Sequence, residues 1–413
     1  MKFRKFKKLQ SHKPTSSHNS TLETAVSLYA SGKFAEAMSL VEKLVKIKPQ
    51  DAVGLNLAAA CSFTLGNLSA AEDYLLKALH VTPDNPEIHN NLGNLFVALN
   101  RVAEAEISYQ HAISIRPDYA EAHYNLGNLL QDQEHFSEAE EAYRRALSIR
   151  PDYAKAYNNL GNLLQDQKRF AEAEEAYRQT LSVRPNYSEA LCNLAVLLQD
   201  QKRFSEAEEA YRSLLFIRPD FAEGHNNLGN IFLEQKRFAR AKKAFLNALS
   251  ISPDYAEAYY NLGNMFVEQR CLVEAEKVYA RALEIRPDYA EVHYNLANML
   301  KEQKRLSEAE KAYGRALESR PGYIKARSGL FHVRRKMCQW TDLKNEAALL
   351  VESMATDQGG CAVPFPLLSV PGINAIQLHQ CARQYAKNRV PNTIFCAPHC
   401  IAWHPKQPPT GCG

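Results

Sequence analysis

The sequence lacks the patterns that place a protein in a membrane or give it a familiar active site. No apolar run approaches the roughly 20 residues that a membrane-spanning helix requires, and the N-terminus lacks the apolar core of a signal peptide. There is also no glycine-rich phosphate loop, no HExxH helix, no CxxC pair and no GxSxG turn. We therefore expect a cytoplasmic protein with no membrane span, no cofactor and no catalytic residues.

Cysteine is scarce before the C-terminal end of the chain. Six of the nine cysteines lie after residue 337. Cys396, His399, Cys400, His404 and Cys412 have metal-ligand chemistry, but their spacing does not match the usual pairs of zinc ligands. We interpret this group as part of an incidental tail and predict no metal site, with an adventitious metal ion as the alternative.

The body of the chain has no large excess of charge of either sign. The formal net charge is +4, and six cations precede the first acid, Glu23: Lys2, Arg4, Lys5, Lys7, Lys8 and Lys13. The remaining residues therefore carry a charge of about −2 and are not expected to bind nucleic acid. We expect residues 1–17 to form a disordered basic tail, with weak electrostatic contact to an anionic membrane or nucleic acid as the alternative.

What the chain does contain is a repeat, most clearly visible in residues 120–153. Apolar and small residues recur there at helical spacing on both sides of a polar break at residues 133–135, which predicts two amphipathic helices joined by a turn. Asp118 stands three residues before Glu121, so we expect a capping box that starts the first helix there. Pro151 has no N–H donor and is expected to end the second helix.

The same unit recurs every 34 residues. Its proline returns at Pro49, Pro83, Pro117, Pro151, Pro185, Pro219, Pro253, Pro287 and Pro321. The signature residues of one unit are Leu126, Gly127, Ala139, Tyr143, Ala146 and Pro151. Their order and spacing resemble the tetratricopeptide repeat. The resemblance implies an all-α tetratricopeptide-repeat solenoid, a right-handed superhelix of helix-turn-helix units.

The repeat divides the chain into five expected regions. They are a tail at residues 1–17, nine repeats at residues 18–323, a degenerate tenth repeat that caps the solenoid at residues 324–356, a joint at residues 357–390, and an irregular tail rich in Cys, His and Pro at residues 391–413. In the first two repeats, Ala25 and Ala59 replace the glycine, and Val41 and Leu75 replace the tyrosine. Such departures are typical of end units.

Three rows of polar residues recur on the first helix of the repeats. We define the first Asn ladder as Asn91, Asn125, Asn159, Asn193, Asn227, Asn261 and Asn295. The second Asn ladder, three residues later, is Asn94, Asn128, Asn162, Asn230, Asn264 and Asn298. The acidic ladder, seven residues after the first, is Asp132, Asp166, Asp200, Glu234, Glu268 and Glu302. Residues at these spacings share one helical face.

We predict that these ladders line the concave side of the solenoid and bind extended peptide segments or proteins. An amide side chain offers a donor and an acceptor, so a row of amides can hold a peptide backbone without reading its sequence. The acidic ladder would favour Lys- or Arg-containing partners. In the alternative interpretation, the Asn residues only cap or space the repeats, or were copied when one unit was duplicated. The oligomeric state is left open.

A second resemblance begins where the repeats end. Cys338-Gln339-Trp340-Thr341-Asp342, the stretch from Val363 to Pro371 and the stretch from Leu378 to Tyr385 look like the joint of bacterial SPINDLY-type, O-GlcNAc-transferase-like proteins. In that family the repeats present protein substrates, and two Rossmann-like lobes transfer N-acetylglucosamine from UDP-GlcNAc. The 23 residues after Val390 match none of the lobe motifs.

This resemblance implies a substrate-binding scaffold without catalysis of its own. One alternative is the non-catalytic part of an enzyme whose lobes are lost or lie on another chain. Another is a co-chaperone-type adaptor that grips carboxylates, which the acidic ladder disfavours.

Overall fold

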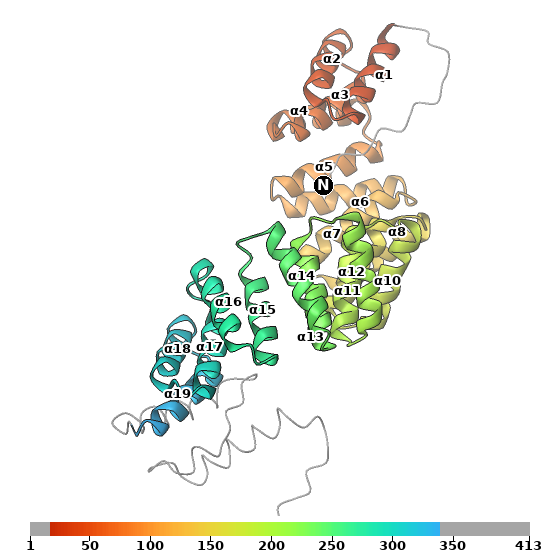
Figure 1. The fold of residues 1–413 in the computed structure, drawn as a ribbon. Coiled ribbons are helices and arrows are strands. Elements are labelled where there is room, and N and C mark those ends of the chain that lie inside the picture. Colours follow the sequence, from red (N-terminus) through yellow and green to blue (C-terminus); the bar gives the residue numbers. More distant parts are fainter. Residues whose placement is uncertain (1–16, 339–413) are drawn as a thin grey trace, which may run out of the picture. The chain divides into compact units, whose positions relative to one another are not determined.

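Residues 17–338 are described by the structure, a computed structural model (Figure 1). In this range the regular structure is α-helical, with nineteen helices and no strand. Residues 1–16 of the predicted tail lie outside the described residues, as do residues 339–356 of the predicted tenth repeat, the whole predicted joint and the irregular tail with its Cys/His group. Ser17, which we expected to end the tail, already belongs to the first helix.

The chain divides into two compact units, residues 1–219 and residues 220–413. The first unit contains α1 (Ser17–Ala30), α2 (Phe34–Ile47), α3 (Ala52–Thr64), α4 (Leu68–Val81), α5 (Pro86–Ala98), α6 (Val102–Ile115), α7 (Ala120–Asp132), α8 (Phe136–Ile149), α9 (Ala154–Asp166), α10 (Phe170–Val183), α11 (Ser188–Asp200) and α12 (Phe204–Ile217). The second unit contains α13 (Ala222–Glu234), α14 (Phe238–Ile251), α15 (Ala256–Glu268), α16 (Leu272–Ile285), α17 (Ala290–Glu302), α18 (Leu306–Ser319) and α19 (Ile324–Lys336).

Helices alternate between two roles. Odd-numbered helices up to α17 are the first helices of the nine repeats, and even-numbered helices are the second helices; each packs against its partner in the same repeat. The helix α19 opens the expected tenth repeat, and its Leu330 is buried, as the register of the repeat predicts. The all-α architecture of helix-turn-helix units that the resemblance to the tetratricopeptide repeat implies is therefore confirmed for the described residues.

The predicted capping box at the start of α7 is wrong. The helix begins at Ala120 with Tyr119 as its N-cap, and no side chain caps it. Asp118 therefore stands one position too early to cap the helix, and Glu121 instead pairs with Arg150 at 3.3 Å. A different contact supports the start of α7, because the ring of His123 donates its Nε2–H to the carbonyl oxygen of Pro117 at 3.0 Å.

The turn inside each repeat depends on one residue in the left-handed backbone conformation. These residues are Gly32, Gly66, Asn100, Glu134, Lys168, Lys202, Lys236, Arg270 and Lys304. Glycine adopts this conformation without steric cost, whereas a residue with a side chain is strained in it. Five successive repeats carry a cation at this strained position.

The core of most repeats is built from one close contact. Tyr143 on α8 is fully buried against Gly127 on α7, and a Cβ added to Gly127 would lie 2.8 Å from the tyrosine ring. Ala139 is also completely buried where the two helices cross. Glycine is therefore required in α7 because the ring occupies the space that a side chain would take.

Candidate functional site

Within each unit, amides of the first Asn ladder join one repeat to the repeat before it. Asn159 on α9 donates from Nδ2 to Asn128 Oδ1 at 2.8 Å and to the Tyr124 hydroxyl at 3.2 Å, both on α7. Asn193 on α11 donates to Asn162 on α9 at 2.8 Å. In the second unit, Asn295 bonds in the same way to Asn264 at 2.8 Å. The ladder amides thus hold neighbouring first helices together.

In three places the acceptor is instead an Asn that stands one position before the ladder. Asn91 donates to Asn56 at 2.8 Å, and Asn125 donates to Asn90 at 2.9 Å. In the second unit, Asn261 donates to Asn226 at 3.0 Å. Sequence reasoning missed these acceptors, although adjacent Asn pairs such as Asn90-Asn91 were a visible signal.

The second Asn ladder connects the first helix to the second helix of the same repeat. The Tyr143 hydroxyl lies 2.8 Å from both Asn128 Oδ1 and Gln131 Oε1, and its single O–H donates to these two acceptors. Tyr177 makes the same pair of bonds one repeat later. Asn94, Asn264 and Asn298 each accept from the tyrosine of their own repeat at 2.9, 2.6 and 2.6 Å, respectively. This ladder is therefore part of the packing inside each repeat.

These hydrogen bonds leave part of some first-ladder amides available. Asn125 and Asn193 are half-buried, and each uses one N–H for the contact with the preceding repeat. Asn159 instead uses both of its N–H groups, for Asn128 and Tyr124. A carboxamide has two N–H donors and a carbonyl acceptor, so one N–H can fix the side chain while the other groups remain for a ligand. Asn91, by contrast, is buried. The half-buried rungs are the better candidates for binding.

The acidic ladder is exposed along its whole length. Asp132, Asp166 and Asp200 are the last residues of α7, α9 and α11, and the acids of the second unit also end their helices. A negative charge at a helix C-terminus is unfavourable because the carbonyl end of the helix dipole is itself negative. Helix formation alone does not explain these acids.

A row of cations runs beside the acids, which sequence reasoning missed. The strained turn residues Lys168, Lys202, Lys236, Arg270 and Lys304 each follow an acidic-ladder residue by two positions. Lys236 pairs with Glu268 of the next repeat at 2.9 Å. These cations therefore offset part of the negative charge of the acidic ladder.

Comparisons with known proteins agree on one family. Models of the tetratricopeptide repeat match residues 28–95, 120–153, 152–219, 226–290 and 266–330, and a TPR repeat model matches residues 93–134. No curated protein sequence matches the chain. The family matches agree with the helix pairs seen in the structure.

Several solved structures are similar to this chain. YrrB, described as a TPR protein with an unusual peptide-binding site, is 21% identical, with 45% of this chain and 96% of YrrB covered and a TM-score of 0.41. The APC/C hetero-tetramer Cut9-Hcn1 is 16% identical, with 69% and 56% covered and a TM-score of 0.45. The pilF protein of Pseudomonas aeruginosa is 19% identical, with 52% and 97% covered and a TM-score of 0.44.

The described residues offer neither a membrane span nor a metal site. Among the helices of residues 17–338, none combines the length and the apolar character that a membrane crossing demands. The same residues contain no group of three or more His, Cys, Asp or Glu arranged to hold a metal ion.

Proposed function

This is a chain of tetratricopeptide repeats, and we propose that its first helices bind extended peptide segments of other proteins. The half-buried amides of the first Asn ladder support this proposal. Asn125 and Asn193 are each held in place by one hydrogen bond to the preceding repeat, so a peptide would meet a carboxamide that is already oriented. Groups that are fixed before binding lose less entropy when a ligand arrives.

The expected affinity follows from the number of rungs. A neutral hydrogen bond contributes a net 0.5 to 1.5 kcal/mol, so the six half-buried rungs supply at most on the order of 3 to 9 kcal/mol before the cost of ordering the peptide is subtracted. We therefore expect micromolar dissociation constants at best. Because the contacts are to the peptide backbone, the range of partners should be broad.

The acidic ladder allows a test that leaves the amides in place. Asp132→Asn, Asp166→Asn and Asp200→Asn remove three exposed charges without touching the hydrogen bonds between repeats. A labelled peptide of alternating Ser and Lys, titrated by fluorescence anisotropy, should bind this triple variant several-fold more weakly than the parent chain. Circular dichroism should show an unchanged helix content.

The matched control removes the same charge elsewhere. Asp84→Asn, Asp118→Asn and Asp152→Asn change three exposed acids in the turns that precede first helices. This control should bind the Ser/Lys peptide as the parent does. Equal binding by all three proteins would remove the acidic ladder from the proposed site, and an absence of peptide binding by the parent would count against the function itself.

We also propose that the chain is related to the substrate-presenting part of O-GlcNAc transferases. This proposal rests on the sequence after the repeats, of which Cys338 alone lies among the described residues. Because that sequence carries no lobe motif, we predict that calorimetry detects no binding of UDP to this chain. Micromolar binding of UDP would contradict the prediction.

A co-chaperone-type adaptor remains the less favoured function. Such an adaptor needs a cation beside the Asn ladders to hold a carboxylate. At repeat nine, Lys301 does donate to Asn298 Oδ1 at 3.2 Å, although Glu302 is also near enough to raise its pKa. Burial lowers the pKa of Lys301. Because the exposed acidic ladder repels a carboxylate, a peptide ending in two acids should bind more weakly than the Ser/Lys peptide.

A further inference from the structure

A groove lies on a different part of the first unit, between the second helices α6 and α8. It has a volume of about 750 Å³, and residues of α7 form part of its wall. Ile113, Leu126, Leu130 and Ala142 give it an apolar lining. None of the ladder residues lines it, so this groove is independent of the proposed peptide-binding surface.

The groove is open because a bridge found in the next two repeats is missing. Arg144 on α8 pairs with Glu140 at 2.7 Å on its own helix and reaches Glu172 on α10 at 3.4 Å. Arg178 on α10 makes the same bridge, to Glu206 on α12 at 2.8 Å. The corresponding residue of α6 is Gln110, which donates to Glu106 on its own helix at 3.0 Å.

A second replacement enlarges the same space. His123 stands on α7 where the next repeat has the larger Tyr157. The His123 ring lines the groove and donates to the Pro117 carbonyl oxygen at 3.0 Å. Burial lowers its pKa, with a smaller contribution in the same direction from Arg145, so the ring is neutral at pH 7. It adds no positive charge to the groove.

The rim of the groove is acidic. Glu106, Glu138 and Glu141 line it. Of the two arginines at the rim, Arg144 is already paired with glutamates of α8 and α10, which leaves Arg145 to offset three carboxylates. An occupant of this groove should therefore combine apolar side chains with several positive charges.

We propose that the N-terminal segment of this chain, residues 2–13, binds in the groove. The segment has six cations and no acid, which complements the three glutamates of the rim. Phe3, Phe6 and Leu9 are interspersed among these cations and can fill the apolar lining. The chain thus contains both the groove and a segment with the positive charges and apolar side chains that the groove should bind.

The linker to the described residues is long enough. Phe6 lies eleven residues before Ser17, where α1 begins, and an extended chain spans about 3.3 Å per residue, or roughly 36 Å. The first helices α1, α3, α5 and α7 contact one another in succession, and helix axes pack 8 to 10 Å apart. Three such steps amount to roughly 24 to 30 Å, so the segment can reach α7 within one molecule.

Photo-cross-linking in the full-length chain tests this proposal. Phe6 is replaced by photoreactive benzoylphenylalanine, and cross-linked residues are identified by mass spectrometry. We expect cross-links within one molecule to α6 and α8, independent of protein concentration and reduced about fivefold or more by high salt, because the attraction is partly ionic. Cross-links spread over the chain, or cross-links that appear only between molecules, would overturn the proposal.

Two sets of substitutions test whether the cross-links depend on the groove. Gln110→Arg together with His123→Tyr fills the groove with the residues that the next repeat carries, so this variant should fold as the parent does and lose the cross-links. Glu106→Gln, Glu138→Gln and Glu141→Gln should reduce them several-fold. The same charge change at exposed Glu175, Glu189 and Glu209 should have no effect. Unchanged cross-links in the groove-filling variant would show that the segment binds elsewhere.

Discussion

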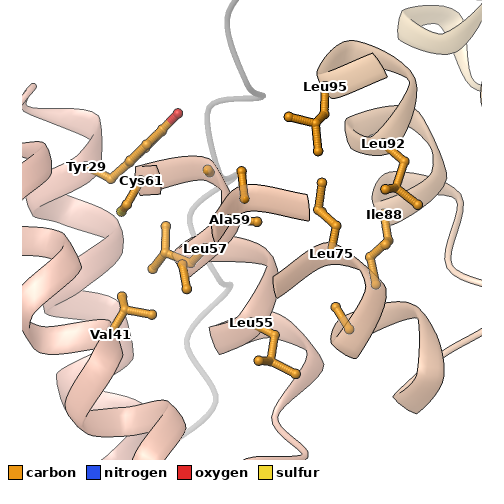
Figure 2. Packing of buried hydrophobic residues seen from close by; sticks show 14 of the residues in the cluster. Tyr29, Val41, Leu55, Leu57, Ala59, Cys61, Leu75, Ile88, Leu92 and Leu95 are labelled. Atoms are coloured by element: carbon orange, nitrogen blue, oxygen red, sulfur yellow. The ribbon is translucent and has the colours of Figure 1, made fainter. Parts of the chain in front are cut away.

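The first two repeats and repeats four and five form the same helix pair with different chemistry. In repeat two, Leu75 fills the space between helices and Ala59 faces it (Figure 2). In repeat five, a buried Tyr177 fills this space, and Gly161 makes room for its ring. The backbone arrangement therefore tolerates either solution, provided that the two positions change together.

The comparison extends to the ladders. The positions of the two Asn ladders are occupied in repeat two by Leu57 and Ala60, both fully buried in the apolar cluster that Figure 2 shows around Val41 and Leu55. In repeats four and five the same positions carry amides that bond between repeats and to tyrosine. This difference shows that polar side chains at the ladder positions are not required to form this fold. The polar repeats instead place amide groups where a ligand could meet them.

The close glycine-tyrosine contact should give the largest stability effect. A Cβ on Gly161 would lie 2.6 Å from the Tyr177 ring, so Gly161→Ala should lower the free energy of unfolding by about 1 to 3 kcal/mol. Adding Tyr177→Leu, which recreates the pair of repeat two, should recover part of this loss. Urea denaturation followed by circular dichroism measures the stability of the single and the double variant. If the effects of Gly161→Ala and Tyr177→Leu on the free energy of unfolding are strictly additive, the two positions are not coupled.

High pH should destabilise the repeats whose core contains a buried tyrosine. Burial raises the pKa of Tyr109, Tyr143 and Tyr177, while a tyrosine in the unfolded chain ionises near pH 10. Burying these tyrosines in their neutral form favours the folded state. This contribution to the free energy of unfolding is complete below about pH 10 and is lost as the pH rises towards the folded-state pKa. Urea midpoints should fall between pH 9 and pH 11, and Tyr143→Phe should make that fall smaller. A pH dependence unchanged by Tyr143→Phe would contradict this explanation.

Loss of one ladder amide should have an intermediate effect. Asn159→Ala removes bonds to Asn128 and Tyr124, worth about 1 to 3 kcal/mol together, while the better helix propensity of Ala returns roughly 0.5 kcal/mol. We expect a net loss of about 1 kcal/mol. Asn193→Ala, which removes one bond, should cost less. An increase in the urea midpoint for Asn159→Ala would mean that the inter-repeat bonds contribute nothing to stability.

The strained turn should give the smallest change. Lys168 has a φ of 62°, whereas repeats one and two have Gly32 and Gly66 at this position. Lys168→Gly should therefore raise the free energy of unfolding by about 0.5 kcal/mol. Lys168→Ala retains a side chain in the left-handed conformation and serves as the control, with no gain expected. Equal midpoints for the Gly and Ala variants would show that the turn stores no strain.

Much of this architecture could be predicted from the sequence because it depends on local periodicity. The 34-residue spacing of proline and alanine predicts helix pairs, and the small residues at Gly127 and Ala139 predict a close crossing. Exchange of Gly and Tyr for Ala and Leu in repeat two was also visible as a pattern. Each of these signals lies within one repeat and needs no knowledge of its neighbours.

What the amides contact was decided by the tertiary structure alone. The sequence placed Asn125 and Asn159 at the same position of the repeat, but only the stacking of α5, α7 and α9 shows that each donates to the preceding repeat. The groove at α6 and α8 is likewise visible only once Gln110 and His123 stand opposite a neighbouring helix. Periodicity determines which face of a helix a residue occupies. Its hydrogen-bond partners depend on distances between residues of different repeats, which only the packed chain defines.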